Sequence, residues 1–518
     1  MLRVIGKVSR NLQPVTRNKS LIKHGVSCIV FSIVIVITCC SIVANAQNLE
    51  NSITMTLTEV VERAKIHSPD AGSANNRFKN SYWKYKSYKA NYRPLVDLSA
   101  TAPDINRSIS RITLDDGSEA FIETSSANSN LNLNVSQNVG FTGGNVFLSS
   151  NLQRIDLIGN NKSTSYLTTP IQIGYTQPLF SFNNWRWQQK IEPLLFEEAQ
   201  RKYIEDIEGV AVNATNLYFD LLRAAINLDI AIMNKANNDM LYKITQGRYN
   251  LGKIAENELL QMELSVLNSN IALAQSKLEL QTSTLKLKSF LGLKDISKIE
   301  LINPRDIPDF QVDVDKAIEL AKQNSQEMLG YRRQLIEADR DVLKAKRENR
   351  FDVQLYATYG LTQSSNDLND LYSNPNDQER FRLGIQLPIF DWGRSKAQIK
   401  MAEANSDLLR TNTEQQMLDY DQSIYLKVMQ FNMQRDQLYI AQKADTIAQK
   451  RYEVTKQRYL IGKIVITDLN IALAEKDQSK RSFVESLRNF WVNYYELRRT
   501  THYDFEQNAK IEYKEPVE

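Results

Sequence analysis

The sequence predicts a mostly helical protein with a β-barrel portion, in which long coiled-coil hairpins and short amphipathic strands occur twice along the chain. Three observations predict this fold class. The amino terminus has the pattern of an export signal, two phrases repeat at a constant offset, and the stretch from Arg394 to Ile461 holds neither glycine nor proline. A helix of that length is about 100 Å long at ~1.5 Å per residue.

Residues 1–46 are predicted to be a removable signal peptide. Six basic residues and no acid occupy residues 1–27, an apolar run follows from Cys28 to Val43, and the small residues Ala44 and Ala46 supply a cleavage site. The run of ~16 residues is short of the ~20 that a spanning helix needs. A transmembrane anchor and a lipidated amino terminus at Cys39 or Cys40 stay open as alternatives.

The charge of the mature chain gives no indication of a nucleic-acid partner. Removal of residues 1–46 takes six of the 64 Lys and Arg residues, so 58 basic residues face 60 acidic ones and the net charge falls from +4 to about −2. All three cysteines leave with the signal. Stability must therefore come from packing or assembly and not from disulfides.

The mature chain is a tandem duplication. Gly174–Phe180 repeats as Gly384–Phe390, and Thr245–Ile254 repeats as Thr455–Ile464, both at an offset of 210. Further upstream, Ala64 matches Ala321 at an offset of 257, so the first copy holds 257 − 210 = 47 extra residues between about 101 and 173. The expected organisation is a first repeat over 47–293, a linker over 294–312, a second repeat over 313–503 and a tail over 504–518.

Each repeat is expected to end in a long helical hairpin. In the first repeat, apolar residues recur at intervals of three and four, which is the spacing of an apolar stripe between neighbouring helices: Ile204, Ile207, Ala211, Ala214, Tyr218, Leu221, Ala225, Leu228 and Ile232, then Leu260, Leu264, Leu267, Ile271, Ala274 and Leu278. In the second repeat the two arms are expected over 394–461 and 463–503.

The segments that precede each hairpin alternate between apolar and polar residues, as amphipathic strands do. They are Leu131–Val139, Ile171–Thr176, Phe351–Gln363 and Phe381–Leu387. The insert is expected to add a hairpin over Leu131–Gln153 around Gly143 and Gly144, whereas Asp104–Asn128 and Ser364–Gln378 are expected to be loops. About four strands cannot close a barrel alone, so several chains must share one.

The order helix, strand, loop, strand, long hairpin, written twice, resembles the TolC-type outer-membrane efflux protein family. The phrases Gln177–Phe180 and Leu387–Phe390, and Arg248–Gly252 and Arg458–Gly462, carry the resemblance. It implies a homotrimer with a shared twelve-stranded barrel in the outer membrane and a periplasmic α-barrel of twelve helices. It further implies a passive exit duct of a tripartite efflux or type I secretion system, with a periplasmic adaptor (membrane fusion) protein and an inner-membrane pump as partners.

Two other kinds of protein share parts of this pattern. An exported structural coiled-coil or adhesin-like protein without a pore does not need amphipathic strands at matching places in both repeats. The pump's periplasmic adaptor would carry a lipoyl-like β domain split around one hairpin, which the sequence does not contain. The transported substrate and the class of pump cannot be deduced from the sequence.

The resemblance places the functional residues at the two hairpin tips. The implied periplasmic gate candidates are Asp468, Glu258 and Tyr459, with a Tyr459–Glu258 contact as a hypothesis; the implied adaptor contacts are Arg248, Tyr249, Gly252, Lys253, Arg458, Gly462 and Lys463. The family's second ring acid and its gating arginine fall at Ile471 and Ile464, so that charge pattern is absent here. The alternative is that the tip acids and arginines are ordinary solvated residues.

Nothing in the sequence indicates an enzyme, a cofactor or a metal site. The mature chain has two histidines, His67 and His502, at opposite ends. Gly247–Lys253 matches part of a phosphate-binding loop, but Ile254 stands where that motif needs Ser or Thr. Trp185, Trp187 and Trp392 follow the strands and serve either as membrane-interface anchors or as packing residues.

Overall fold

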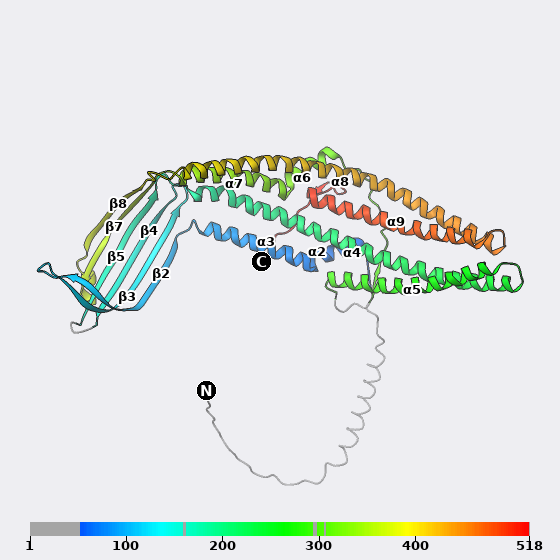
Figure 1. The fold of residues 1–518 in the computed structure, drawn as a ribbon, viewed down its shortest axis with the longest axis horizontal. Helices are drawn as coiled ribbons and strands as arrows, with labels where there is room; N and C mark the ends of the chain where they lie inside the picture. Colours follow the sequence, from blue (N-terminus) through cyan, green and yellow to red (C-terminus); the bar gives the residue numbers. More distant parts are fainter. Residues whose placement is uncertain (1–51, 159–161, 294–297, 305–306, 517–518) are drawn as a thin grey trace, which may run out of the picture.

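The computed structural model describes residues 52–158, 162–293, 298–304 and 307–516. The predicted signal peptide over 1–46 lies outside the described residues. The chain is elongated, with a β-sheet at one end and long helices that run from the sheet to two hairpin tips at the other end (Figure 1).

The sheet has six antiparallel strands in the order β2-β3-β4-β5-β7-β8. Their bounds are β2 (Leu95–Thr113), β3 (Glu119–Val139), β4 (Gly144–Leu157), β5 (Ser163–Pro178), β7 (Asp352–Ser365) and β8 (Asn376–Gln386). The first repeat supplies four strands and the second repeat supplies two. The family resemblance implies four strands per chain, so the structure differs by one added hairpin.

The expected loop over Asp104–Asn128 was wrong. This stretch forms the distal halves of β2 and β3, which stay paired from Asp104 with Asn128 to Thr113 with Glu119. Its Asn, Ser and Asp residues disfavour strands, but their cross-strand pairing outweighs that intrinsic preference. The predicted hairpin around Gly143 is confirmed, and the stretch between β7 and β8 holds only a short helix, η1 (Leu368–Tyr372).

Eight α-helices are described, and their bounds lie close to the expected ones in both hairpins. They are α2 (Leu57–His67), α3 (Pro69–Ala90), α4 (Asn184–Asn250), α5 (Glu256–Phe290), α6 (Val314–Asn324), α7 (Gln326–Glu348), α8 (Arg394–Leu460) and α9 (Ile466–Thr501). Ser68 and Ser325 occupy equivalent places in the two repeats. Each ends one helix and accepts a hydrogen bond from a backbone N–H in the first turn of the next.

The helices form one curved layer whose members change along its length. Next to the sheet the order is α3-α4-α7-α8, and toward the tips it is α5-α4-α9-α8 (Figure 1). The helices α4 and α8 thus run through both halves, and α8 is at one edge of the layer throughout. Among the described residues, no helix has the length and apolar composition needed to cross a membrane.

The main core lies midway along the helices. Short pairs of strands frame it, β1 (Ser52–Met55) with β6 (Lys298–Leu301) and β9 (Tyr503–Asp504) with β10 (Ala509–Lys510). The carboxylate of Glu208 is fully buried there, with Lys65 Nζ at 3.4 Å and Arg498 Nε at 3.0 Å, and it accepts a hydrogen bond from the Tyr513 hydroxyl. This cluster joins α2, α4, α9 and the C-terminal tail.

Candidate functional site

The two hairpin tips lie together at the end of the molecule farthest from the sheet (Figure 1). Gly252 and Gly462 end α4 and α8 with φ of +66° and +75°, a conformation that glycine adopts without strain. The following residues close both turns in the same way, since Lys253 N–H donates to the Arg248 carbonyl and Lys463 N–H to the Arg458 carbonyl, each at 2.9 Å. The predicted turns are confirmed.

Tyr459 joins the two tips, but its partner is not the predicted one. Its ring is buried, and its hydroxyl lies 3.1 Å from the hydroxyl of Thr245 on α4. Within the described part of this chain that hydroxyl bonds to Thr245 and not to Glu258, which is half-buried in the first turn of α5. Within one chain the hypothesis of a Tyr459–Glu258 contact was therefore wrong, because Thr245 on α4 takes the place next to the tyrosine hydroxyl.

Arg248 caps the helix of the opposite hairpin. Its guanidinium donates to the carbonyl of Leu460 at 2.9 Å and to that of Tyr459 at 3.3 Å, and it lies over the Tyr459 ring, 5.3 Å from the centroid. These carbonyls lie at the negative end of the α8 dipole, so a cation is favourable there, although the Tyr459 carbonyl also accepts from Gly462 N–H at 2.9 Å. Arg458, the second-repeat counterpart, is exposed.

The remaining predicted tip residues are accessible to solvent. Asp468 is exposed in the first turn of α9, where an acid also complements the helix dipole. Tyr249, Gly252, Lys253, Gly462 and Lys463 are exposed at the turns. Two apolar neighbours were not singled out from the sequence, Leu251 at 71% exposure and Ile461 at 65%. Their position next to the turn glycines is the signal that could have identified them.

A small separate core holds the tips together beneath these exposed residues. Its buried members come from both hairpins, and they are Leu241, Met262, Tyr452, Tyr459, Ile466, Leu469 and Ala472. The side chains of Thr245 and Arg248 lie next to this core through their contacts with Tyr459. The arrangement can keep two hairpins closed without any charge pair between acids and arginines.

Both lateral edges of the chain expose apolar side chains, α8 along most of its length and α5 in the half toward the tips. On one edge, α8 exposes a stripe of apolar residues: Met401, Leu408, Leu418, Leu426, Met433, Ile440, Ile447 and Val454. On the other edge, α5 exposes the stripe that the sequence predicted for a neighbouring helix, and Leu260, Leu264, Leu267, Ile271 and Leu278 are each at least 55% exposed. The predicted stripe of α4 is instead largely buried within the chain.

Comparison with known proteins assigns the chain to a family. The profile of the family described as outer membrane efflux proteins matches residues 60–293 and 314–499. The chain belongs to this family. It is therefore an outer-membrane channel protein with a large periplasmic part, and it is not an enzyme. No curated protein matches the sequence.

Solved structures of outer-membrane channels share the fold of this efflux protein. The CmeC channel of Campylobacter jejuni is 17% identical, with a TM-score of 0.63 and coverage of 88% of this chain and 87% of that one. The outer membrane protein VceC of Vibrio cholerae is 15% identical, with a TM-score of 0.59 and coverage of 88% and 97%. CusC is 15% identical, with a TM-score of 0.60 and coverage of 86% and 91%. At these identities the likeness concerns the fold, and it confirms the predicted fold class.

The tryptophans next to the sheet of the efflux protein differ in their surroundings. Trp185 is half-buried and packs edge-on against Tyr92, with ring centroids 5.5 Å apart. Trp187 is half-buried beneath the ammonium group of Lys190. Trp392 is 89% exposed where β8 leads into α8. Of these three, Trp392 therefore presents the ring that is free to enter a membrane interface.

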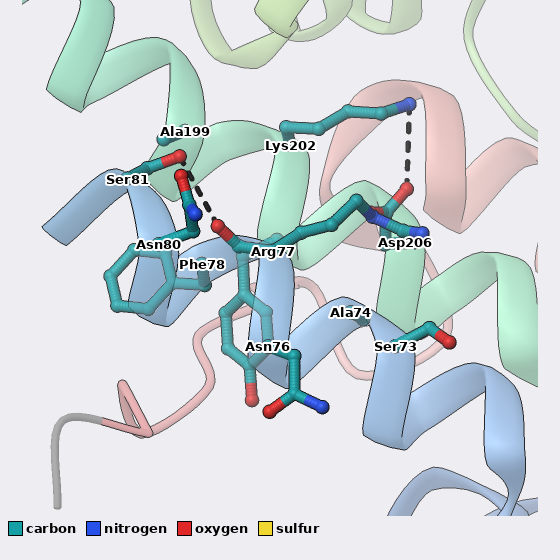
Figure 2. Close-up of a pocket in the computed structure, with 11 residues that line it drawn as sticks. Ser73, Ala74, Asn76, Arg77, Phe78, Asn80, Ser81, Ala199, Lys202 and Asp206 are labelled. Carbon is teal, nitrogen blue, oxygen red and sulfur yellow. Dashed lines mark hydrogen bonds and ion pairs between the residues drawn. The ribbon is translucent and has the colours of Figure 1, made fainter. Parts of the chain in front are cut away.

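An open cavity of about 590 Å³ lies between α3 and α4 of the efflux protein (Figure 2). Arg77 and Lys202 reach the same carboxylate, since Arg77 Nη2 lies 2.9 Å and Lys202 Nζ 3.4 Å from Asp206 oxygens. The cavity floor is the buried ring of Phe78. Arg77 and Lys202 already form ion pairs with Asp206, and α3 lies at the edge of the helical layer. We therefore treat this cavity as part of the edge surface and not as a binding or catalytic site.

Proposed function

We propose that three copies of this chain form a channel that serves as the passive exit duct of a tripartite efflux or type I secretion system. The observation that carries the proposal is the pair of unlike apolar edges. The α8 edge of one copy can cover the α5 edge of another copy while both copies keep the same orientation in the membrane. Such a head-to-tail contact closes into a ring when the rotation per copy fits.

Two arguments support three copies, namely the family to which the chain belongs and the number of helices that each copy adds to the tube. Each copy offers four helices side by side in either half of the layer. Three copies then supply twelve helices, as the resemblance implies. The exposed stripe on α5 has the three- and four-residue spacing of neighbouring coiled-coil helices, and the stripe on α8 repeats mostly every seven residues, which suits this contact.

The hairpin tips are the proposed gate. Arg248, Tyr459 and Thr245 hold the first hairpin to the second within each copy, and Asp468 from three copies supplies an acidic ring at the mouth. Opening requires the tips to separate, so the contacts of Arg248 oppose it. Glu258 is assigned a place at the mouth but no bond to Tyr459.

The exposed tip residues are the proposed contact with a periplasmic adaptor protein. Leu251 and Ile461 offer apolar side chains next to Lys253, Lys463 and Arg458. An adaptor with complementary apolar and acidic residues would bury these side chains. The inner-membrane pump is the proposed energy source, and the outer-membrane lipid surrounds the sheet end.

The test is purification from outer membranes in detergent, followed by native mass measurement and single-channel recording in a planar bilayer. The expected result is a trimer with low, cation-favouring conductance, because the mouth is closed and acidic. A monomer, or a trimer without conductance, would contradict the duct and favour a scaffold without a pore.

A further inference from the structure

All six strands carry the same two-sided pattern, including β3 and β4, the pair that is added to the four strands of the family. One ladder of direct cross-strand partners is polar or glycine on every strand from β2 to β8: Asp97, Asn134, Ser149, Gln172, Gly360 and Gln378. In this ladder Asn134 Nδ2 donates to Asp97 Oδ1 at 3.1 Å. The added strands therefore contribute to the same polar face as the other four.

The adjacent ladder on the opposite face is apolar. It runs through Val96, Val135, Leu148, Ile173 and Tyr359, and ends on β8 at Glu379, the partner of Tyr359. Nearer the helices the same face of β8 is apolar, with Phe381, Leu383 and Ile385. Val96 is 62% exposed, Ile173 53% and Phe381 73%, so the apolar face is uncovered from one edge of the sheet to the other. A lipid-facing surface has this pattern on every strand of a membrane barrel.

The free edges of the sheet are β2 and β8 in the described part of the chain. The inner strands, β3 and β4 among them, are hydrogen-bonded on both sides. A barrel that used only four strands per copy would have to break ladders of this sheet. With β2 and β3 outside the barrel, β3 would leave β4 and lose a ladder that is continuous from Ser126 to Val139. With β3 and β4 outside the barrel, the ladders of β3 with β2 and of β4 with β5 would both be lost.

The turn of the added hairpin is fixed to the helical frame. The side-chain Nδ2 of Asn183, at the start of α4, donates to the backbone carbonyls of Gly140 and Phe141, each at 3.1 Å. Gln177 Nε2 donates to the Thr142 carbonyl at 2.9 Å, and Gln137 Nε2 to the Tyr92 carbonyl at 3.3 Å. The pair is thus part of the junction between sheet and helices and not an appendage.

The width of the six-stranded sheet also matches the width of the helical layer that it joins. Six strands spaced ~4.8 Å apart and tilted by ~40° occupy about 38 Å of circumference, whereas four strands occupy about 25 Å. The four helices that meet the sheet in each copy occupy about 32–40 Å at spacings of ~8–10 Å. Six strands therefore match the helices beneath them without a taper, and four strands do not.

We infer that all six strands of each copy enter the shared barrel, so that three copies close an eighteen-stranded barrel in place of the twelve-stranded one implied by the family. This inference rests on the proposed trimeric channel. A barrel of eighteen strands is about 36 Å across its backbone, and side chains of ~5 Å on each side leave a lumen of about 26 Å. The same estimate for twelve strands gives about 14 Å. The outer mouth thus admits bulky solutes, such as small folded polypeptides, that a twelve-stranded mouth excludes.

Cysteine cross-linking tests which strands meet between copies. The predicted mature chain has no cysteine, so only engineered pairs can react. Arg382→Cys on β8 is combined in turn with Asp97→Cys, Ser99→Cys or Thr101→Cys on β2. The matched control combines Arg382→Cys with Ser149→Cys or Asn151→Cys on β4, because these positions lie on the same polar face of the sheet. The expected result is cross-linked trimers with β2 positions only. Cross-links with β4, or none with any β2 position, would overturn the eighteen-stranded barrel.

Polymer exclusion gives a second readout on the unmodified channel. Neutral polymers of graded size are added only to the outer side during single-channel recording. Polymers with diameters between about 14 and 26 Å are expected to enter and lower the conductance, as the two lumen estimates require. Conductance that is unaffected by polymers in this range refutes the wide barrel but leaves the channel intact. Absence of any conductance refutes the proposed function itself.

Discussion

Substitution of Arg248 by alanine should raise the open probability of the channel. The guanidinium of Arg248 is the group on the first hairpin that caps the end of α8, through the carbonyls of Leu460 and Tyr459. Alanine removes both hydrogen bonds and the contact with the Tyr459 ring. The Tyr459 carbonyl keeps its bond from Gly462 N–H, and the carbonyl of the half-buried Leu460 is left to water, so no buried group is orphaned.

The size of the effect follows from the interactions that alanine removes. A hydrogen bond to a charged donor contributes about 1.5–3 kcal/mol, and a cation over an aromatic ring at an exposed site about 0.5–1 kcal/mol. Because Arg248 is half-buried and its second bond is long, we take about 2 kcal/mol for the set, the lower part of that range. At ~1.4 kcal/mol per factor of ten, the separated state of the tips becomes about 30-fold more populated.

Single-channel recording of Arg248→Ala in a planar bilayer measures this change as longer and more frequent openings. The matched control is Arg458→Ala, which removes the same side chain at the equivalent place of the second repeat, where it is exposed. That variant should behave like the parent channel. Equal effects of both substitutions would show that the tip responds to net charge and not to the cap on α8. No effect of Arg248→Ala would remove the residue from the gate.

Three further predictions concern stability and assembly. Glu208→Gln should lower the free energy of unfolding, measured in thermal melts, by about 3 kcal/mol, because it removes the charge that pairs with buried cations. The control Glu197→Gln, in a surface ion pair, should lower it by less than about 1 kcal/mol. Equal losses in the two variants would contradict this prediction. Burial lowers the pKa of His502 from 6.5 to about 4, so the stability of the fold should fall as the pH drops from 6.5 toward 4. His502→Asn should flatten this pH dependence of the melting temperature. Asparagine is chosen because it tolerates the φ of +51° at this position. Gly174→Ala should impair trimer assembly on gels because its new carbon meets the Phe147 ring, whereas Gly384→Ala, whose nearest contact is 3.9 Å, should assemble normally.

The long helices and their turns could be predicted from the sequence because they depend on local properties. The absence of glycine and proline between Arg394 and Ile461 fixed the extent of α8 to within one residue. The duplication placed Gly252 and Gly462 at equivalent turns, and both adopt positive φ. Family membership followed from the same repeated phrases, since their order is specific even where each phrase is short.

The distal hairpin and the tip contacts could not be predicted because they depend on pairing across the chain. Asp104–Asn128 is rich in residues that favour turns. It forms two strands only because its first half pairs in register with its second half. The partner of Tyr459 depends on the rotation of α4 about its own axis, which apolar spacing fixes only to within a face of the helix. Thr245 and Glu258 lie on different arms of the first hairpin, so sequence alignment alone could not choose between them.

The two repeats have equivalent sequences at their tips but unequal roles, and this bears on how the mouth opens. Arg248 caps α8, while Arg458 is exposed, so the arginine cap at the turns is donated from the first repeat to the second and not in both directions. At the sheet the first repeat is again the larger contributor, with four strands against two. A tube of six identical hairpins could open only by moving all of them alike. Here one arginine per copy supplies the cap, beside the Tyr459–Thr245 contact and the shared core, so its loss weakens the hold of the first hairpin on the second and leaves their other contacts in place.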